Sequence, residues 1–231
     1  VTMPPRSSPA RPRGSDTVRV ALFDIDGTLY PSGCLLTERL DRRITEFVAE
    51  HLGLDIEAAD SLRSRTLRAH GSTLRGLIAL HGVDPDVYYG FLSAVDPRDY
   101  LRPDERLRAM LGRITARVAA FTNAPRGHAW GVLEALGVAG AFERVYTIEE
   151  TGYRGKPDPA AYEGALHALG VDDATKVTMV EDTRRFLAPA RDLGMSTVLV
   201  GGVAHGDRAA DVVIDAIHRL PDAAPWLFEP A

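Results

Sequence analysis

The chain has 231 residues, of which 45% are hydrophobic and 26% charged, with a formal net charge of −5. This composition is typical of a globular protein whose core fills one large or two modest domains. A single cysteine, Cys34, excludes an intrachain disulfide. The chain has no basic stripe and no apolar run of about 18 residues, so we expect a cytoplasmic monomer or homodimer without nucleic-acid or membrane partners.

The first 16 residues are rich in proline and arginine, which predicts a disordered tail, and they lack the apolar segment of a secretory signal. The apolar run Val18–Phe23 then predicts a buried parallel strand. It ends at Asp24-Ile25-Asp26-Gly27. Because side chains two apart on an extended segment point the same way, Asp24 and Asp26 should project together. Two such carboxylates need a cation or a shared proton, which indicates metal or acid–base chemistry.

The next 85 or so residues have helical spacing and no strand-like run. The predicted helices are Leu36–Leu52, Ile56–Ala69, Thr73–Leu80 and one that begins at Asp84-Pro85, and a helix over Asp104–Leu111 brings the chain back. We therefore predict a helical segment over residues 34–101, inserted into a core formed by residues 17–33 and 102–231.

The rest of the chain alternates strands and helices. The predicted strands are Ala116–Phe121, Arg144–Ile148, Val177–Val180, Thr197–Val200 and Val212–Ile214, and the helices are Arg126–Leu136, Pro159–Leu169 and Thr183–Leu193. Such alternation predicts an α/β fold with a doubly wound, mostly parallel, Rossmann-like sheet.

Polar residues follow two of these strands and one loop. Thr122-Asn123 ends the second strand, and Glu181-Asp182 ends the fourth. Lys156 stands before Pro157, and the chain has only one other lysine among 27 lysines and arginines. A compact ammonium on a flexible stem can reach a carboxylate and a phosphate together, so this lysine indicates a catalytic role.

These four segments, in this order, resemble the motifs of the haloacid-dehalogenase-like phosphohydrolases, over roughly Val18 to Val200. The resemblance implies a phosphomonoesterase that uses Mg²⁺ and an aspartyl-phosphate, with a small helical cap. Asp24 would be the nucleophile and Asp26 the general acid–base. Thr122 and the backbone amide of Asn123 would hold a phosphoryl oxygen, and Lys156 would balance charge. Asp24, Asp182 and the main-chain carbonyl of Asp26 would bind Mg²⁺, with Glu181 a further ligand directly or through water.

The substrate is expected to be a small phosphorylated metabolite. Asp26 argues against a dehalogenase, which has no leaving alkoxide to protonate. Leu29-Tyr30-Pro31, the stretch from His70 to Leu77, and Phe121–Ala124 with His128 resemble the pyrimidine 5′-nucleotidase branch. That resemblance implies a pyrimidine nucleoside 5′-monophosphate as substrate, with Ser72, Thr73 and Arg75 of the cap facing its base or sugar.

Three alternatives stay open at this point: a sugar-phosphate phosphatase, a phosphomutase, and a regulatory protein that has kept the fold and lost turnover. The last alternative rests on Phe186, which stands where that branch usually has an asparagine that orients the metal ligands. Arg184, Arg185 or Glu181 would have to replace this amide.

Overall fold

The computed structural model describes residues 19–202 and 210–228, so the predicted N-terminal tail lies outside the described residues. Six strands form one sheet in the order β3-β2-β1-β4-β5-β6, and every neighbouring pair is parallel. The predicted doubly wound α/β fold is confirmed. The strands are β1 Val20–Phe23, β2 Arg117–Phe121, β3 Arg144–Tyr146, β4 Val177–Glu181, β5 Ser196–Val200 and β6 Val212–Ile214.

The first strand lies at the centre of the sheet. All four residues of β1 are completely buried, because β2 and β4 flank it and helices cover both faces. The strand order changes direction between β1 and β4, so polar residues that follow β1, β2 and β4 meet at one edge. In open α/β sheets this crevice is the usual ligand site.

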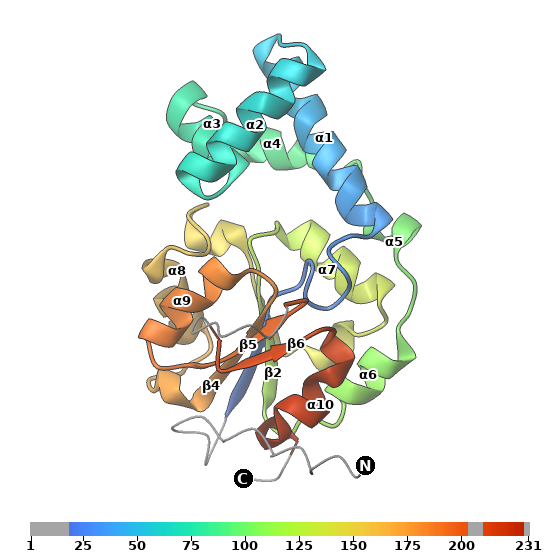
Figure 1. Cartoon of the computed structure of the whole chain (residues 1–231), viewed down its shortest axis with the longest axis vertical. Helices are drawn as coiled ribbons and strands as arrows, with labels where there is room; N and C mark the ends of the chain where they lie inside the picture. Colours follow the sequence, from blue (N-terminus) through green and yellow to red (C-terminus); the bar gives the residue numbers. More distant parts are fainter. Residues whose placement is uncertain (1–18, 203–209, 229–231) are drawn as a thin grey trace, which may run out of the picture.

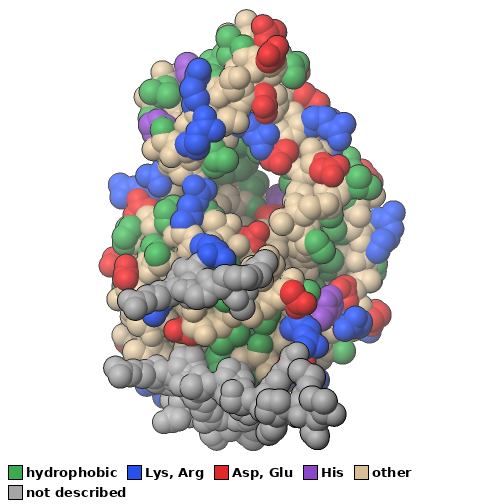
Figure 2. Space-filling view, viewed as in Figure 1, with side chains coloured by type: hydrophobic (Ala, Val, Ile, Leu, Met, Phe, Trp, Pro, Cys, Tyr) green, Lys and Arg blue, Asp and Glu red, His purple; other side chains and the backbone are tan. Residues whose placement is uncertain are grey.

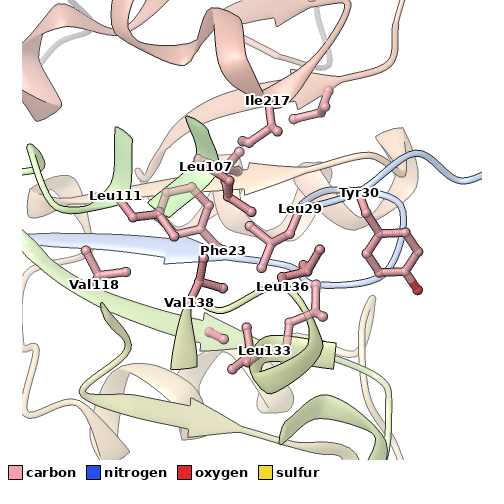
Figure 3. Close-up of a cluster of buried hydrophobic side chains, with 14 of the residues drawn as sticks. Phe23, Leu29, Tyr30, Leu107, Leu111, Val118, Leu133, Leu136, Val138 and Ile217 are labelled. Atoms are coloured by element: carbon pink, nitrogen blue, oxygen red, sulfur yellow. The ribbon is translucent and has the colours of Figure 1, made fainter. Parts of the chain in front are cut away.

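Helices α6 (Glu105–Leu111), α7 (Arg126–Ala135) and α10 (Leu220–Ala223) cover one face of the sheet, and α8 (Pro159–Ala168) and α9 (Arg184–Asp192) the other. On the first face Phe23 packs among Leu107, Leu111 and Leu133 (Figure 3). Burial of such aliphatic and aromatic side chains is the main favourable contribution to folding. Short 3₁₀ helices span Ala139–Ala141, Ile148–Thr151, Ala174–Lys176, Ile217–Arg219 and Pro225–Leu227.

A separate helical group follows β1 and stands above the carboxyl edge of the sheet (Figure 1). It contains α1 (Leu35–Leu52), α2 (Ile56–His70), α3 (Thr73–His81) and α4 (Pro85–Leu92), and the chain returns through α5 (Pro97–Tyr100). The group has its own apolar core, with Phe47, Val48, Leu77 and Tyr88 buried at its centre. Among the described residues no helix is long and apolar enough to cross a membrane.

Most predicted boundaries differ from the structure by one or two residues. The third strand was predicted to reach Ile148. It ends at Tyr146, and Ile148 belongs to a 3₁₀ helix instead. The reason is a capping box, in which Thr147 and Glu150 satisfy each other's backbone N–H groups and start the turn. Helices α5 and α10 were not predicted, since four residues that include a proline show no helical period.

Candidate active site

Asp24 is the centre of a buried polar cluster just after β1. Its side chain accepts a hydrogen bond from Lys156 Nζ at 2.7 Å and another from Thr28 Oγ1 at 3.0 Å. Burial, with help from the charges of Asp182 and Asp26, raises the pKa of Asp24 to about 6 in spite of the attraction of Lys156. A cation that joined this cluster would favour the ionised carboxylate.

Lys156 is fully satisfied by protein groups. Its ammonium donates to Asp24, to the carbonyl of Phe121 at 2.9 Å and to Glu181 Oε2 at 2.6 Å. An ammonium has three N–H groups, so all are in use. Burial alone would lower the pKa of Lys156, but the two carboxylates outweigh it and raise the pKa. Lys156 is therefore a buried positive charge that fixes the orientation of Asp24.

Asp26 has a different environment, on the side toward helix α7. Its Oδ1 lies 2.7 Å from Nε2 of His128 and accepts a 2.5 Å hydrogen bond from the Tyr30 hydroxyl. Burial would raise the pKa of Asp26, but the charge and hydrogen bond of His128, with that of Tyr30, hold it below its usual value. The two aspartates of the motif thus have pKa values shifted in opposite directions, which is typical of acid–base pairs.

The end of β4 adds two carboxylates. Oxygen atoms of Asp24, Glu181 and Asp182 lie within 4.8 Å of one another, a donor set that suits a hard divalent cation. Both carboxylate oxygens of Glu181 already accept hydrogen bonds. Oε2 accepts from Lys156, and Oε1 accepts from the backbone N–H groups of Asp182 and Thr183 at 3.1 Å. Asp24 and Asp182 therefore fit direct ligation better, and Glu181 fits a supporting role.

Gly27 allows Asp182 to approach the first motif. It has φ +88°, and a Cβ atom there would lie 2.2 Å from Asp182 Oδ2. A larger residue would be strained and would push the carboxylate away.

Thr122 and Asn123 follow β2, next to β1. Thr122 is buried, and its Oγ1 accepts from the backbone N–H of Ala124 at 3.0 Å, which leaves its own O–H to donate. The Asn123 side chain clamps the backbone of Lys156: Oδ1 accepts from its N–H at 2.7 Å, and Nδ2 donates to its carbonyl at 2.9 Å. The lysine loop is thereby fixed to the second motif.

A cavity of about 760 Å³ lies between the helical group and the carboxyl edge of the sheet, where Figure 2 shows the molecule hollowed. Asp26, Asn123 and His128 line its lower part, and Ser72, the N-cap of α3, and Thr73, its first residue, line its wall. Arg75 is not among the lining residues. The structure thus brings Ser72 and Thr73, but not Arg75, to the same cavity as Asp26 and Asn123, while Asp24, Thr122, Lys156, Glu181 and Asp182 do not line it.

Phe186 and Arg185 also line this cavity. The ring of Phe186 lies 5.5 Å from Lys156 Nζ and 5.0 Å from the guanidinium carbon of Arg185. Arg185 donates a 2.7 Å hydrogen bond to the carbonyl of Gly71 in the helical group. The resemblance leads one to expect an asparagine at position 186. The aromatic ring of Phe186 stands there instead, beside the buried ammonium of Lys156. Glu181 is the neighbouring residue that accepts a hydrogen bond from this ammonium.

The sequence interpretation gave no role to Tyr30 or His128, although both occur in segments that it quoted. His128 bonds Asp26 from 102 positions away, which no local pattern indicates, whereas Tyr30 bonds Asp26 within the same loop, four residues on. The only available signal was their place in the two motif segments.

Comparisons with known proteins agree with this geometry. A family model described as haloacid dehalogenase-like hydrolase matches residues 18–194. Phosphate metabolism protein 8 of Saccharomyces cerevisiae is 27% identical over 83% of this chain, which spans only 64% of that protein. A phosphoglycolate phosphatase of Rhodospirillum rubrum is 29% identical over 79% of both chains. The crystal structure of CbbY from Rhodobacter sphaeroides in complex with phosphate shares the fold, with a TM-score of 0.64 at 20% identity over 91% of this chain and 99% of that one.

Proposed function

Because the chain belongs to the haloacid dehalogenase-like hydrolases, we propose that it is a Mg²⁺-dependent phosphomonoesterase that works through an aspartyl-phosphate. The observation that carries the proposal is the 2.7 Å contact between Lys156 and Asp24, beside a second aspartate with its own partners. Three relatives with phosphatase names support it: the phosphoglycolate phosphatase and two archaeal glyceraldehyde 3-phosphate phosphatases.

The reaction divides into two steps. In the first, an oxygen of Asp24 attacks phosphorus in line with the leaving oxygen, and Asp26 gives that oxygen a proton as the P–O bond breaks. In the second, Asp26 takes a proton from water, which attacks phosphorus and releases Asp24 and inorganic phosphate. The Thr122 hydroxyl and the Asn123 backbone amide hold a phosphoryl oxygen in both steps.

Asp24, Asp182 and the main-chain carbonyl of Asp26 are the groups that would hold Mg²⁺, with Glu181 in support. The ion, when bound, neutralises charge on the phosphoryl oxygens. The acidic cluster fits this ion because only one ammonium, that of Lys156, lies among its carboxylates.

For the substrate we propose a pyrimidine nucleoside 5′-monophosphate, with residues 34–101 acting as a cap over the cavity. Ser72 and Thr73 line this cavity and are the cap residues expected to contact the leaving group. A sugar phosphate is the second candidate, because relatives named for glyceraldehyde 3-phosphate and phosphoglycolate act on small phosphate esters.

The experiment is hydrolysis of p-nitrophenyl phosphate with and without Mg²⁺, followed by a panel of nucleotides and sugar phosphates. Mg²⁺-dependent release of phosphate supports the proposal. A complete absence of turnover on every ester would overturn it and favour a regulatory protein that has lost catalysis. A higher kcat/KM for a pyrimidine nucleotide than for the sugar phosphates supports the proposed substrate. A higher kcat/KM for a sugar phosphate makes that ester the substrate instead.

A further inference from the structure

The upper part of the cavity is mostly apolar. Leu40, Ile44, Leu67, Leu74 and Leu92 of the helical group line it. Cavities of about 300–1,000 Å³ with apolar walls and a few placed polar groups are typical of sites for ligands of drug size. At about 760 Å³, this cavity is far larger than a leaving group such as glycolate requires. A leaving group with an extended apolar body would use the space.

One tyrosine in this apolar region has a hydroxyl without a partner in the protein. Tyr88 of α4 is 4% exposed and lines the cavity. Its ring is fixed by edge contacts with Phe47 at 5.1 Å and Tyr89 at 5.2 Å. In the part of the chain that the structure describes, the Tyr88 hydroxyl forms no hydrogen bond, and the buried side-chain polar atoms without a partner are Glu149 Oε2 and Ser196 Oγ, so the Tyr88 oxygen is accessible from the cavity. A hydroxyl that lines a cavity and has no protein partner can donate to a ligand bound there.

Two charged residues act on the same hydroxyl. Burial raises the pKa of Tyr88, the positive charge of Arg63 lowers it and the carboxylate of Asp41 raises it. Arg63 of α2 donates to the carbonyl of Asp41 at 3.2 Å, to the Asp41 carboxylate and to Thr45 Oγ1 at 3.4 Å, and it pairs with Asp60 at 3.8 Å. Both Arg63 and Asp41 line the cavity.

These groups retain free hydrogen-bonding capacity. A guanidinium has five N–H groups, and three hydrogen bonds leave two of them to donate. The Asp41 carboxylate keeps an oxygen that can accept. The site therefore offers donors from Tyr88 and Arg63 and an acceptor from Asp41, next to aliphatic walls. A planar heterocycle with neighbouring carbonyl and N–H groups matches this pattern, whereas a sugar has no use for the aliphatic walls.

We propose that Tyr88, Arg63 and Asp41 form a subsite in the helical group that binds the polar edge of a nucleobase in the leaving group. This inference rests on the proposed phosphatase function and deepens it. The sequence resemblance predicts that residues at the start of α3 contact the base. The proposed subsite instead uses residues of α1, α2 and α4.

The test compares uridine 5′-monophosphate with ribose 5-phosphate, which lacks the base. Tyr88→Phe removes only the hydroxyl, so the variant should fold and melt at the wild-type temperature. We expect kcat/KM to fall about tenfold to a hundredfold for the nucleotide, with less than about a twofold change for ribose 5-phosphate. Asp41→Ala, which removes the carboxylate acceptor, should give the same split. Tyr100→Phe, a half-buried tyrosine outside the cavity lining, is the matched control and should change neither value.

Equal losses on both substrates, no loss on either, or a lower melting temperature for Tyr88→Phe would overturn the subsite. Its failure can be separated from that of the phosphatase proposal. A wild-type enzyme that hydrolyses ribose 5-phosphate but neither hydrolyses the nucleotide nor binds uridine keeps the function and removes the subsite. If no ester is hydrolysed, calorimetric titration with uridine still tests the subsite: binding that Tyr88→Phe weakens supports it, and absent binding overturns it.

Discussion

Nε2 of His128 lies 2.7 Å from Oδ1 of Asp26, although the two residues are 102 positions apart in the chain. The pair joins the loop after β1 to helix α7. It holds the pKa of Asp26 below its usual value and that of His128 above its own. The pair therefore favours the ionised form of Asp26 in the free protein, which is the form that takes a proton from water in the second step.

The first prediction concerns stability against pH in metal-free protein. Asp26 stabilises the fold above its unfolded pKa of about 4 and loses this contribution as pH falls through its lowered pKa. His128 stabilises it below about pH 6.5 and loses this contribution as pH rises through its raised pKa. His128→Gln should therefore cost more unfolding free energy at about pH 5.5 than at about pH 9, measured with urea in EDTA. His81→Gln at an exposed helix end is the control, and an equal cost at both pH values would contradict the pairing.

Much of the fold follows from local pattern. The run before Asp24 is apolar on both faces, so the sequence alone indicates a central parallel strand, and the polar residues at three strand ends must then meet. The short helices α5 and α10 have no period and were not predicted. Contacts between distant segments, such as that of His128 with Asp26, were not predictable either, since no local spacing encodes them.

The cavity illustrates the same limit. Ser72 and Thr73 were placed at the site from a resemblance, and they do line the cavity, while Arg75 of the same helix does not. Which side of α3 faces the sheet depends on how the four helices pack, which a one-dimensional pattern leaves open. Tyr88, Arg63 and Asp41 come from three helices, and nothing in their own segments marked them.

The second prediction concerns the nucleophile. Asp24→Asn keeps the shape and an oxygen that can accept from Lys156, but an amide does not attack phosphorus. We expect turnover below about a thousandth of the wild-type value and no phospho-enzyme in acid-quenched mass spectra. Asp26→Asn should instead slow both steps about a hundredfold or more while the phosphoryl group still reaches Asp24. Substantial activity in Asp24→Asn would remove the covalent mechanism.

The third prediction concerns the metal. Asp182→Ala removes one of the two carboxylates that best fit direct ligation, so the Mg²⁺ concentration for half-maximal activity should rise on the order of tenfold or more. The rise in melting temperature on addition of Mg²⁺ should shrink in parallel. Ca²⁺ should inhibit, because its larger and looser coordination disturbs in-line geometry. Asp173→Ala, an exposed acid that pairs with Lys176, is the control. Full activity of wild-type protein in EDTA would refute the assignment.

The last prediction separates two roles of Asn123. Its backbone amide is expected to hold a phosphoryl oxygen, whereas its side chain clamps the backbone of Lys156. Asn123→Ala keeps the amide and removes the clamp, so Lys156 and Asp24 should lose alignment and kcat should fall about tenfold to a hundredfold with little change in KM. Asn123→Asp keeps the acceptor for the Lys156 N–H but has no donor for its carbonyl, so it should recover only part of the rate. Loss of the two partly buried hydrogen bonds should also lower stability by about 1–3 kcal/mol in the alanine variant. A raised KM at unchanged kcat would instead mean that the side chain binds the substrate itself, and the clamp would then have no part in the rate.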